Sequence, residues 1–367
     1  MKRLLPILLA VTLLFCGCAK PGKTETQPSA TEETSAPTET EAGKVTVPTV
    51  PDESTAAPTE KEEAPYHNPL TGEPMEAPLE TRPVAVVINN IVYALPHHGT
   101  EQADIVYEIL AEANITRCLG IFSDASDVAK VGSIRSARTY LISLATSYNA
   151  LLVHAGASCF ASDDLAYTGY DHLDGGYYPE YFYRDQDRLN NGYALEHTLF
   201  VSGPDIYECA QKHDVDMSVA EDREYGLHFA EDGTPDGEKA EQITVDFLSG
   251  SKTTTMTYNA EKGMYYGTEY GLDFVVGNSD DLVGFKNVFV IHAETWTKDD
   301  GYHRAADLTG EGDGWYACGG KIIPIRWHRD GDSEPFTYTL ADGTPLEQGI
   351  GRSYIAVVPI SGQVDYQ

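Results

Sequence analysis

Basic residues are scarce in this sequence, and their scarcity excludes one broad class of partner. Lysine and arginine together number 25, against 57 aspartates and glutamates, so the formal net charge is −32 at pH 7. A body with this charge has no electrostatic footprint for the phosphate backbone of nucleic acid. The sequence therefore predicts no nucleic-acid partner, and a local basic pocket inside so acidic a body would stand out.

Cysteine is also rare, with six among 367 residues. The chain has no CxxC spacing and no His-x-His pattern beside a cysteine, so it predicts no metal site, and nothing in it points to a cofactor. Four cysteines belong to the part expected to fold: Cys118, Cys159, Cys209 and Cys318. We interpret them as small buried apolar residues; the alternative is one disulfide, for which Cys118 and Cys159 are the best candidates.

Standard catalytic motifs are missing from Tyr66 onward. This part of the chain contains no P-loop, no GxSxG nucleophile motif and no HExxH zinc motif. Motifs alone therefore name no reaction, and whether the protein is an enzyme stays open.

The N-terminus carries the apolar run expected of a signal peptide. Lys2 and Arg3 precede an apolar stretch over residues 4–15, and Gly17 and Cys18 follow it. The stretch is too short for a permanent membrane span. A small residue before cysteine, with Leu14 four positions upstream, resembles the lipobox of bacterial lipoproteins. We therefore expect a signal peptide over residues 1–17 and lipidation of Cys18, for example with palmitate, so that the membrane is a partner; the alternative is an ordinary secretory signal.

The next stretch has the composition of a tether. Residues 19–65 are rich in Thr, Glu, Pro, Ser and Ala and contain no aromatic residue. Such a segment cannot bury enough apolar surface to offset the entropy of ordering. We expect lipidated Cys18 and a disordered linker over residues 18–65, followed by two folded domains over residues 66–225 and 240–367.

Apolar runs over residues 83–89, 118–122 and 150–154 predict strands covered on both faces. Thr100 offers an N-cap for a helix over residues 100–113, and a second helix is expected to start near Ser133 or Ser136. Alternating strands and helices predict an α/β N-terminal domain with a mainly parallel sheet. From residue 240, short alternating runs separated by Asp-Gly turns predict a mostly antiparallel, β-rich C-terminal domain.

Ligands of parallel sheets collect beyond the carboxyl ends of the strands, so the candidate site lies there. Arginine clusters bind carboxylates and phosphates, and histidine serves as acid or base near neutral pH. The candidate ligand-binding residues are Arg117, Arg135, Arg138, Asp104, Ser136 and Ser158. The candidate catalytic residues are His154, His197 and Glu108, the last as the group that orients a histidine.

Alternatives stay open for these residues. Asp104, Glu108 and Glu112 recur every fourth residue, which suits a solvated helix face. The alternative is that Asp104 and Glu108 pair with the arginines. If the arginines are paired internally, the cluster is structural. The three functions that fit are binding of an anionic or glycan-derived cell-envelope ligand, hydrolysis of a phosphate- or carboxylate-bearing glycan, and a non-catalytic structural interaction module.

Several segments together resemble one known family. They are RPVAVVINN (82–90), ADIVYEILAEANITR (103–117), VGSIRSAR (131–138), VHAGAS (153–158) and HTLF (197–200). In combination they resemble the YerB-like lipoproteins of Gram-positive bacteria. The resemblance implies a lipid-anchored protein on the outer face of the cell membrane, with a two-part domain of unknown function. It implies no reaction, so no catalytic residue is carried over from it.

Overall fold

The computed structural model describes residues 66–220 and 223–367. The predicted signal peptide, the lipidation site at Cys18 and the predicted linker lie outside these residues. Within the part that is described, no helix has both the length and the apolar character needed to cross a bilayer.

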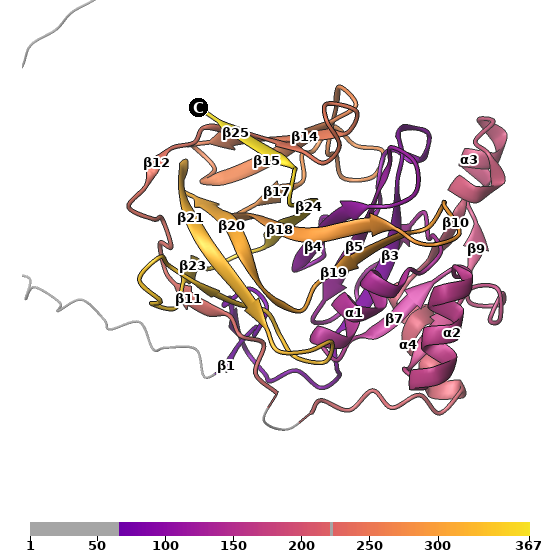
Figure 1. Cartoon of the computed structure of the whole chain (residues 1–367). Helices are drawn as coiled ribbons and strands as arrows, with labels where there is room; N and C mark the ends of the chain where they lie inside the picture. The colour runs from indigo at the N-terminus through magenta and orange to yellow at the C-terminus, as the bar shows by residue number, and fades with distance from the viewer. Residues whose placement is uncertain (1–65, 221–222) are drawn as a thin grey trace, which may run out of the picture. The chain divides into compact units, whose positions relative to one another are not determined.

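One mixed sheet of twelve strands runs through both halves of the described chain (Figure 1). Its main path has the order β12-β21-β20-β18-β24-β4-β5-β3-β7-β8, while β19 pairs with β18 and β22 with β21. The strands are β3 (Val84–Asn90), β4 (Ile105–Leu110), β5 (Thr116–Phe122), β7 (Leu151–His154), β8 (His172–Asp174), β12 (Glu238–Lys239), β18 (Asn287–Thr297), β19 (Arg304–Asp307), β20 (Gly310–Cys318), β21 (Lys321–Arg329), β22 (Thr337–Thr339) and β24 (Ser353–Pro359). Because β24 pairs in parallel with β4, strands of the two predicted domains belong to one sheet.

A second, six-stranded sheet is antiparallel throughout. Its order is β16-β15-β14-β13-β25, with β17 paired to β15. The strands are β13 (Gln242–Asp246), β14 (Thr253–Asn259), β15 (Met264–Glu269), β16 (Leu272–Asp273), β17 (Gly284–Phe285) and β25 (Gln363–Tyr366). The expectation of an antiparallel sheet in the C-terminal part is thus confirmed.

Helices are few and short. They are α1 (Thr139–Ser147), α2 (Cys159–Thr168), α3 (Gln186–Asn190) and α4 (Gly203–Lys212), with 3-10 turns η1 (Val92–Ala94) and η2 (Leu195–His197). The remaining short strands are β1 (Tyr66–His67), β2 (Pro74–Met75), β6 (Val131–Gly132), β9 (Tyr183–Arg184), β10 (Leu199–Val201), β11 (His228–Ala230) and β23 (Glu347–Gly349).

The large sheet is covered on both faces, as alternation along β3 shows. Val84, Val86 and Ile88 pack in one core cluster with residues of α4 and of the six-stranded sheet. Ala85 and Val87 point the other way, into a cluster that contains residues of α1 and α2. Since successive side chains of a strand alternate between faces, both faces of β3 are buried, and its sequence reads as a continuous apolar run.

The helix expected over residues 100–113 is absent, and strand β4 occupies Ile105–Leu110 instead. All six of its side chains are buried, so the segment shows no apolar/polar alternation that would reveal a strand. Glu108 is among these buried residues because Lys252 lies 2.8 Å from its carboxylate. The helical spacing of the acids was therefore misleading.

The expectation of a mainly parallel N-terminal sheet was also wrong. Strand β5 is antiparallel to both β3 and β4, whereas β3, β7 and β8 run parallel. Helix α1 begins at Thr139 rather than near Ser133 or Ser136, and Arg138 is its N-cap residue. The strands predicted around β3, β5 and β7 are confirmed.

The four cysteines of the described residues are free. Cys118, Cys209 and Cys318 are buried, as expected for small apolar residues, whereas Cys159 is exposed. The alternative of a disulfide between Cys118 and Cys159 does not hold in this structure.

Candidate functional site

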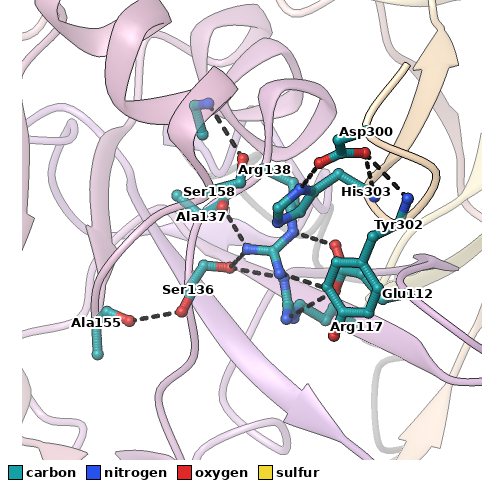
Figure 2. Close-up of polar contacts among 11 residues, drawn as sticks. Glu112, Arg117, Ser136, Ala137, Arg138, Ala155, Ser158, Asp300, Tyr302 and His303 are labelled. Atoms are coloured by element: carbon teal, nitrogen blue, oxygen red, sulfur yellow. Dashed lines mark hydrogen bonds and ion pairs between the residues drawn. The ribbon is translucent and has the colours of Figure 1, made fainter. Parts of the chain in front are cut away.

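Two of the predicted arginines, Arg117 and Arg138, bind the buried carboxylate of Glu112. Glu112 lies in the tight connection between β4 and β5, and Arg138 approaches it through two nitrogens, Nε and NH2, the latter at 2.7 Å (Figure 2). Arg117 of β5 donates to the same carboxylate from 3.1 Å. All three side chains are at most 7% exposed. Fork-to-fork geometry of this kind is the strongest form of ion pairing in proteins.

In this cluster two guanidiniums share one carboxylate, so the ionised group carries one net positive charge. Burial alone would raise the pKa of Glu112, but the bond from Arg138 and the positive charges of Arg117 and Arg138 outweigh burial and lower it. Burial, together with the charge of Arg138, lowers the pKa of Arg117 to about 10. Arg117 and Arg138 are thus paired internally, although through Glu112 and not through the expected Asp104 or Glu108.

Both candidate serines stabilise the local backbone. Ser158 is the N-cap of α2, and its Oγ accepts a hydrogen bond from Ala161 N at 3.1 Å. The hydroxyl of Ser136 donates to the carbonyl of Ala155 at 3.0 Å, while its own carbonyl accepts from Arg117. These bonds hold the segment around Ser136 beside the segment that follows β7 (Figure 2).

Asp104 and Glu108 lie away from the arginine cluster. Asp104 accepts hydrogen bonds from the side chain of Asn68 and from the backbone N–H of Ser123. Burial raises its pKa. No bond among the described residues joins Glu108 to His154 or His197, so Glu108 does not orient either histidine in this structure.

Glu108 belongs to a separate buried network between the two sheets. Lys252 contacts Glu108 at 2.8 Å and also binds Glu269 of β15. All three side chains are fully buried. Burial raises the pKa of Glu269 to about 7 despite the nearby ammonium. No local sequence pattern predicts this network, because its members come from segments far apart in the chain.

Short contacts connect the end of β3 to His197 and, through Glu196, to Arg135. The amide of Asn89 donates to His197 Nδ1 at 2.9 Å, and His197 Nε2 faces Glu196 Oε1 at 3.5 Å. The other oxygen of Glu196 lies 3.7 Å from NH1 of Arg135. Burial lowers the pKa of His197, so the ring is neutral at pH 7 and its Nε2–H can donate.

A hollow of about 640 Å³ opens beside this chain of contacts. Its lining includes His197, Glu196, Tyr193 and Tyr93. Tyr93 belongs to η1 and is 70% exposed. The Arg135 side chain keeps 25% of its surface exposed, and its only ion-pair partner among the described residues, Glu196, is itself 57% exposed. The place therefore combines a loosely held guanidinium, a neutral imidazole and a free aromatic face.

His154 lies in a different, smaller cavity of about 340 Å³ at the carboxyl ends of the parallel strands β7 and β8. Its Nδ1 donates to the carbonyl of Gly156 at 2.7 Å, and its Nε2 lies 2.9 Å from Nδ1 of His172. Asp174 and Tyr177 also line the cavity. Burial lowers the pKa of both imidazoles. The sequence placed His154 at this edge but missed His172.

The predicted arginines and histidines thus form three groups and not one pocket. Arg117 and Arg138 are held by Glu112, Arg135 meets His197 through Glu196, and His154 pairs with His172. A larger hollow of about 700 Å³ lies elsewhere, between residues 75–81 and Tyr207, and its lining contains no arginine, lysine or histidine. The groups of the candidate site therefore lie away from this larger hollow.

Two family models match this chain in succession. Residues 70–216 match the model described as "Protein of unknown function (DUF3048) N-terminal domain". Residues 243–355 match the model of the corresponding C-terminal domain. The two matches follow the order of the two parts expected from the sequence.

A curated protein and a solved structure are similar over most of the chain. The chain is 29% identical over 296 residues to "Putative lipoprotein YerB" of Bacillus subtilis (strain 168), covering 79% of this chain and 86% of that protein. The crystal structure of the YerB protein from Bacillus subtilis superposes with a TM-score of 0.71 at 27% identity, over 82% of this chain and 99% of that one.

Proposed function

This chain belongs to the YerB-like family with its two-part domain of unknown function, and on that premise we propose that it is a membrane-anchored extracytoplasmic lipoprotein that binds an anionic, glycan-derived ligand of the cell envelope. The binding site is the hollow beside Arg135, His197 and Tyr93. The observation that carries the proposal is the partly exposed guanidinium of Arg135, whose ion-pair partner Glu196 lines that hollow.

The anchor is a lipid on Cys18, at the outer face of the membrane of a Gram-positive-type envelope. The lipobox-like sequence before Cys18 and the word lipoprotein in the name of the Bacillus relative support it. Labelled palmitate should enter the wild-type chain and the Cys16→Ala variant, and should not enter Cys18→Ala. Equal labelling of Cys18→Ala would remove the anchor from the proposal.

An anionic group of the ligand would bind Arg135 in exchange for Glu196. Exposed ion pairs such as this one contribute only about 0–1 kcal/mol, so a ligand carboxylate or phosphate can replace Glu196 at small cost. Arg117 and Arg138 cannot serve in the same way, because Glu112 binds both in a buried geometry. Among the three predicted arginines, Arg135 is therefore the one that can bind an anion.

A sugar ring would stack on Tyr93, and its hydroxyl groups would accept from His197. Aromatic side chains offer a flat apolar face that suits the faces of sugar rings, and a buried hydrogen-bond donor fixes the orientation of the bound sugar. Tyr193 also lines the hollow, and two contacts hold its side chain in place. Its hydroxyl donates to the carbonyl of Leu95, and its ring packs against the Arg188 guanidinium.

Calorimetric titration with a cell-wall disaccharide that carries a carboxylate tests this proposal. Arg135→Gln should weaken binding about 10- to 100-fold, because a charge-assisted hydrogen bond contributes about 1.5–3 kcal/mol. The matched control is Arg326→Gln, at an exposed arginine paired with Glu311 and Asp313, which should leave the affinity unchanged. Masking the carboxylate of the sugar should have the same effect as Arg135→Gln. Equal affinities of wild type and Arg135→Gln would refute the site.

Hydrolysis of such a glycan is a second candidate, and the paired imidazoles of His154 and His172 favour it. Both nitrogens of His154 are bonded, so His154 would orient His172, whose Nε2 makes no hydrogen bond within the described residues. Incubation with the same glycan should then release product from wild type and none from His172→Ala. Intact glycan after incubation with wild type would exclude hydrolysis and leave binding untouched.

A further inference from the structure

Three metal-ligand side chains meet at the N-terminal end of α2. Cys159 is the first residue of this helix, and Asp300 and His303 belong to the turn between β18 and β19. One ligand atom from each residue lies within 4.8 Å of the ligand atoms of the other two. Neither the candidate hollow nor the His154 cavity includes these residues in its lining.

We propose that Cys159, Asp300 and His303 bind a divalent transition metal of the zinc class. Sulfur, imidazole nitrogen and carboxylate oxygen together are the donor set of tetrahedral zinc, and three protein ligands leave a fourth position for water. Hard cations such as Ca²⁺ and Mg²⁺ prefer oxygen ligands alone, so the thiolate and imidazole favour zinc, cobalt or nickel over them.

The thiol is available for a metal. Cys159 is exposed and free, whereas the three other cysteines of the described residues are buried. Its neighbour Phe160 packs edge-on against the ring of His303, with 5.9 Å between ring centres. This contact holds the turn against the start of α2 before any metal arrives.

The turn already orients its two ligands. Asp300 accepts hydrogen bonds from the backbone N–H groups of Tyr302 and His303, each at 3.0 Å. Its second oxygen lies 2.5 Å from Nδ1 of His303 (Figure 2). This contact fixes the orientation of the imidazole relative to the carboxylate.

Binding would draw the two segments together. Donor atoms around a tetrahedral zinc ion lie about 3.5 Å apart, given bond lengths of about 2.0–2.3 Å. Because the three ligand atoms already lie within 4.8 Å of one another, the turn would need to move toward α2 by about 1 Å at most. Since Cys159 falls in the N-terminal family match and His303 in the C-terminal one, the metal would join the two matched parts.

Titration of the metal-free full chain with Co²⁺ tests the site, because a cobalt–thiolate bond gives a near-ultraviolet charge-transfer band. One equivalent should produce the band and the strong visible absorption of tetrahedral cobalt, and zinc should displace both. Cys159→Ala should abolish the band. His303→Ala should weaken binding by about 10- to 100-fold or more, the loss typical of a disturbed ligand shell.

The chain offers a matched control in His328 and Asp330. This exposed pair also has a contact between imidazole and carboxylate, here from Nε2 at 3.0 Å, but among the described residues it is not part of a group of three metal ligands. His328→Ala should leave cobalt affinity and the spectrum unchanged. If wild type shows no thiolate band at saturating cobalt, or if Cys159→Ala binds cobalt as wild type does, the proposal is overturned and the Asp300–His303 contact only stabilises its turn. Circular dichroism of each variant separates lost binding from lost folding.

Discussion

Arg135 NH1 lies 3.7 Å from Oε2 of Glu196, in an ion pair whose acid is more than half exposed. Three residues further on, Arg138 is held by Glu112 through two nitrogens and is almost fully buried. Two arginines of one short segment therefore have different roles. Arg138 is held inside the fold, and Arg135 is the arginine for which we propose an exchange of Glu196 for a ligand.

Glu196→Gln should strengthen binding of a carboxylated glycan. The substitution removes the acid that competes with the ligand for Arg135, and an exposed pair contributes about 0.2–1 kcal/mol, so affinity should rise by up to about fivefold. Calorimetric titration measures the change, and the urea unfolding midpoint should stay within error of wild type. Weaker binding would mean that Glu196 itself contacts the ligand.

Glu112→Gln should destabilise the protein by about 3–5 kcal/mol, because the substitution leaves two buried guanidiniums without their counter-charge. Urea denaturation followed by circular dichroism gives the free energy of unfolding. The control is Glu311→Gln, at an exposed partner of Arg326, which should cost at most about 1 kcal/mol. Similar losses in the two variants would show that the Glu112 cluster is as solvated as a surface pair.

Lys252→Met should cost about 3–5 kcal/mol, because it leaves the buried carboxylates of Glu108 and Glu269 without a cation. Adding Glu269→Gln to this variant removes one of the two carboxylate charges and should recover part of the loss. The melting temperatures of wild type and of both variants measure this recovery. Additive losses would contradict a shared network, since coupling is expected only between residues in contact.

The free energy of unfolding should fall in mild acid because His97 is buried in its neutral form. Burial lowers its folded-state pKa to about 4, although its bond to the Asn89 carbonyl and the charge of Glu108 oppose this, and the charges of Arg188 and Lys252 add to it. Between pH 6.5 and about 4 the unfolded chain therefore binds a proton that the folded chain does not. The free energy of unfolding should fall over this range by on the order of 3 kcal/mol from His97 alone.

Comparison of wild type with His97→Gln isolates this contribution, because glutamine can still donate to the Asn89 carbonyl and does not titrate. Unfolding measured at a series of pH values should give a shallower fall between pH 6.5 and 4 in the variant. His328→Gln, at an exposed histidine, should follow wild type. Parallel curves for wild type and His97→Gln would show that His97 titrates normally in the folded state.

Local sequence patterns predicted strands β3, β5 and β7 but failed at β4. Val84–Asn90 and Leu151–His154 are short apolar runs between turns, and such runs form strands covered on both faces. In β4 the acid Glu108 interrupts the run at helical spacing from Asp104 and Glu112. Its cation, Lys252, comes from a segment 144 residues later, so no local pattern could reveal it.

The candidate site was predictable in part for the same reason. The sequence placed Arg135, His154 and the end of β3 near one edge, and the backbone contacts between their segments agree with that placement. The sequence pattern does not show that Glu112 binds Arg117 and Arg138. Glu112 lies in the loop between β4 and β5, where the pattern predicts a helix. The proximity of Cys159 to His303 was not predictable from local patterns either, since strand pairing brings distant segments together.

The central claim is that Arg135 binds the anionic group of an envelope glycan while Tyr93 holds its sugar ring. Its most direct test is the crystal structure of the protein with the carboxylated cell-wall disaccharide bound. We expect carboxylate oxygens about 2.7–2.9 Å from the Arg135 guanidinium, Glu196 turned away, and a sugar ring against Tyr93. A disaccharide bound elsewhere, with Arg135 still facing Glu196, would contradict it.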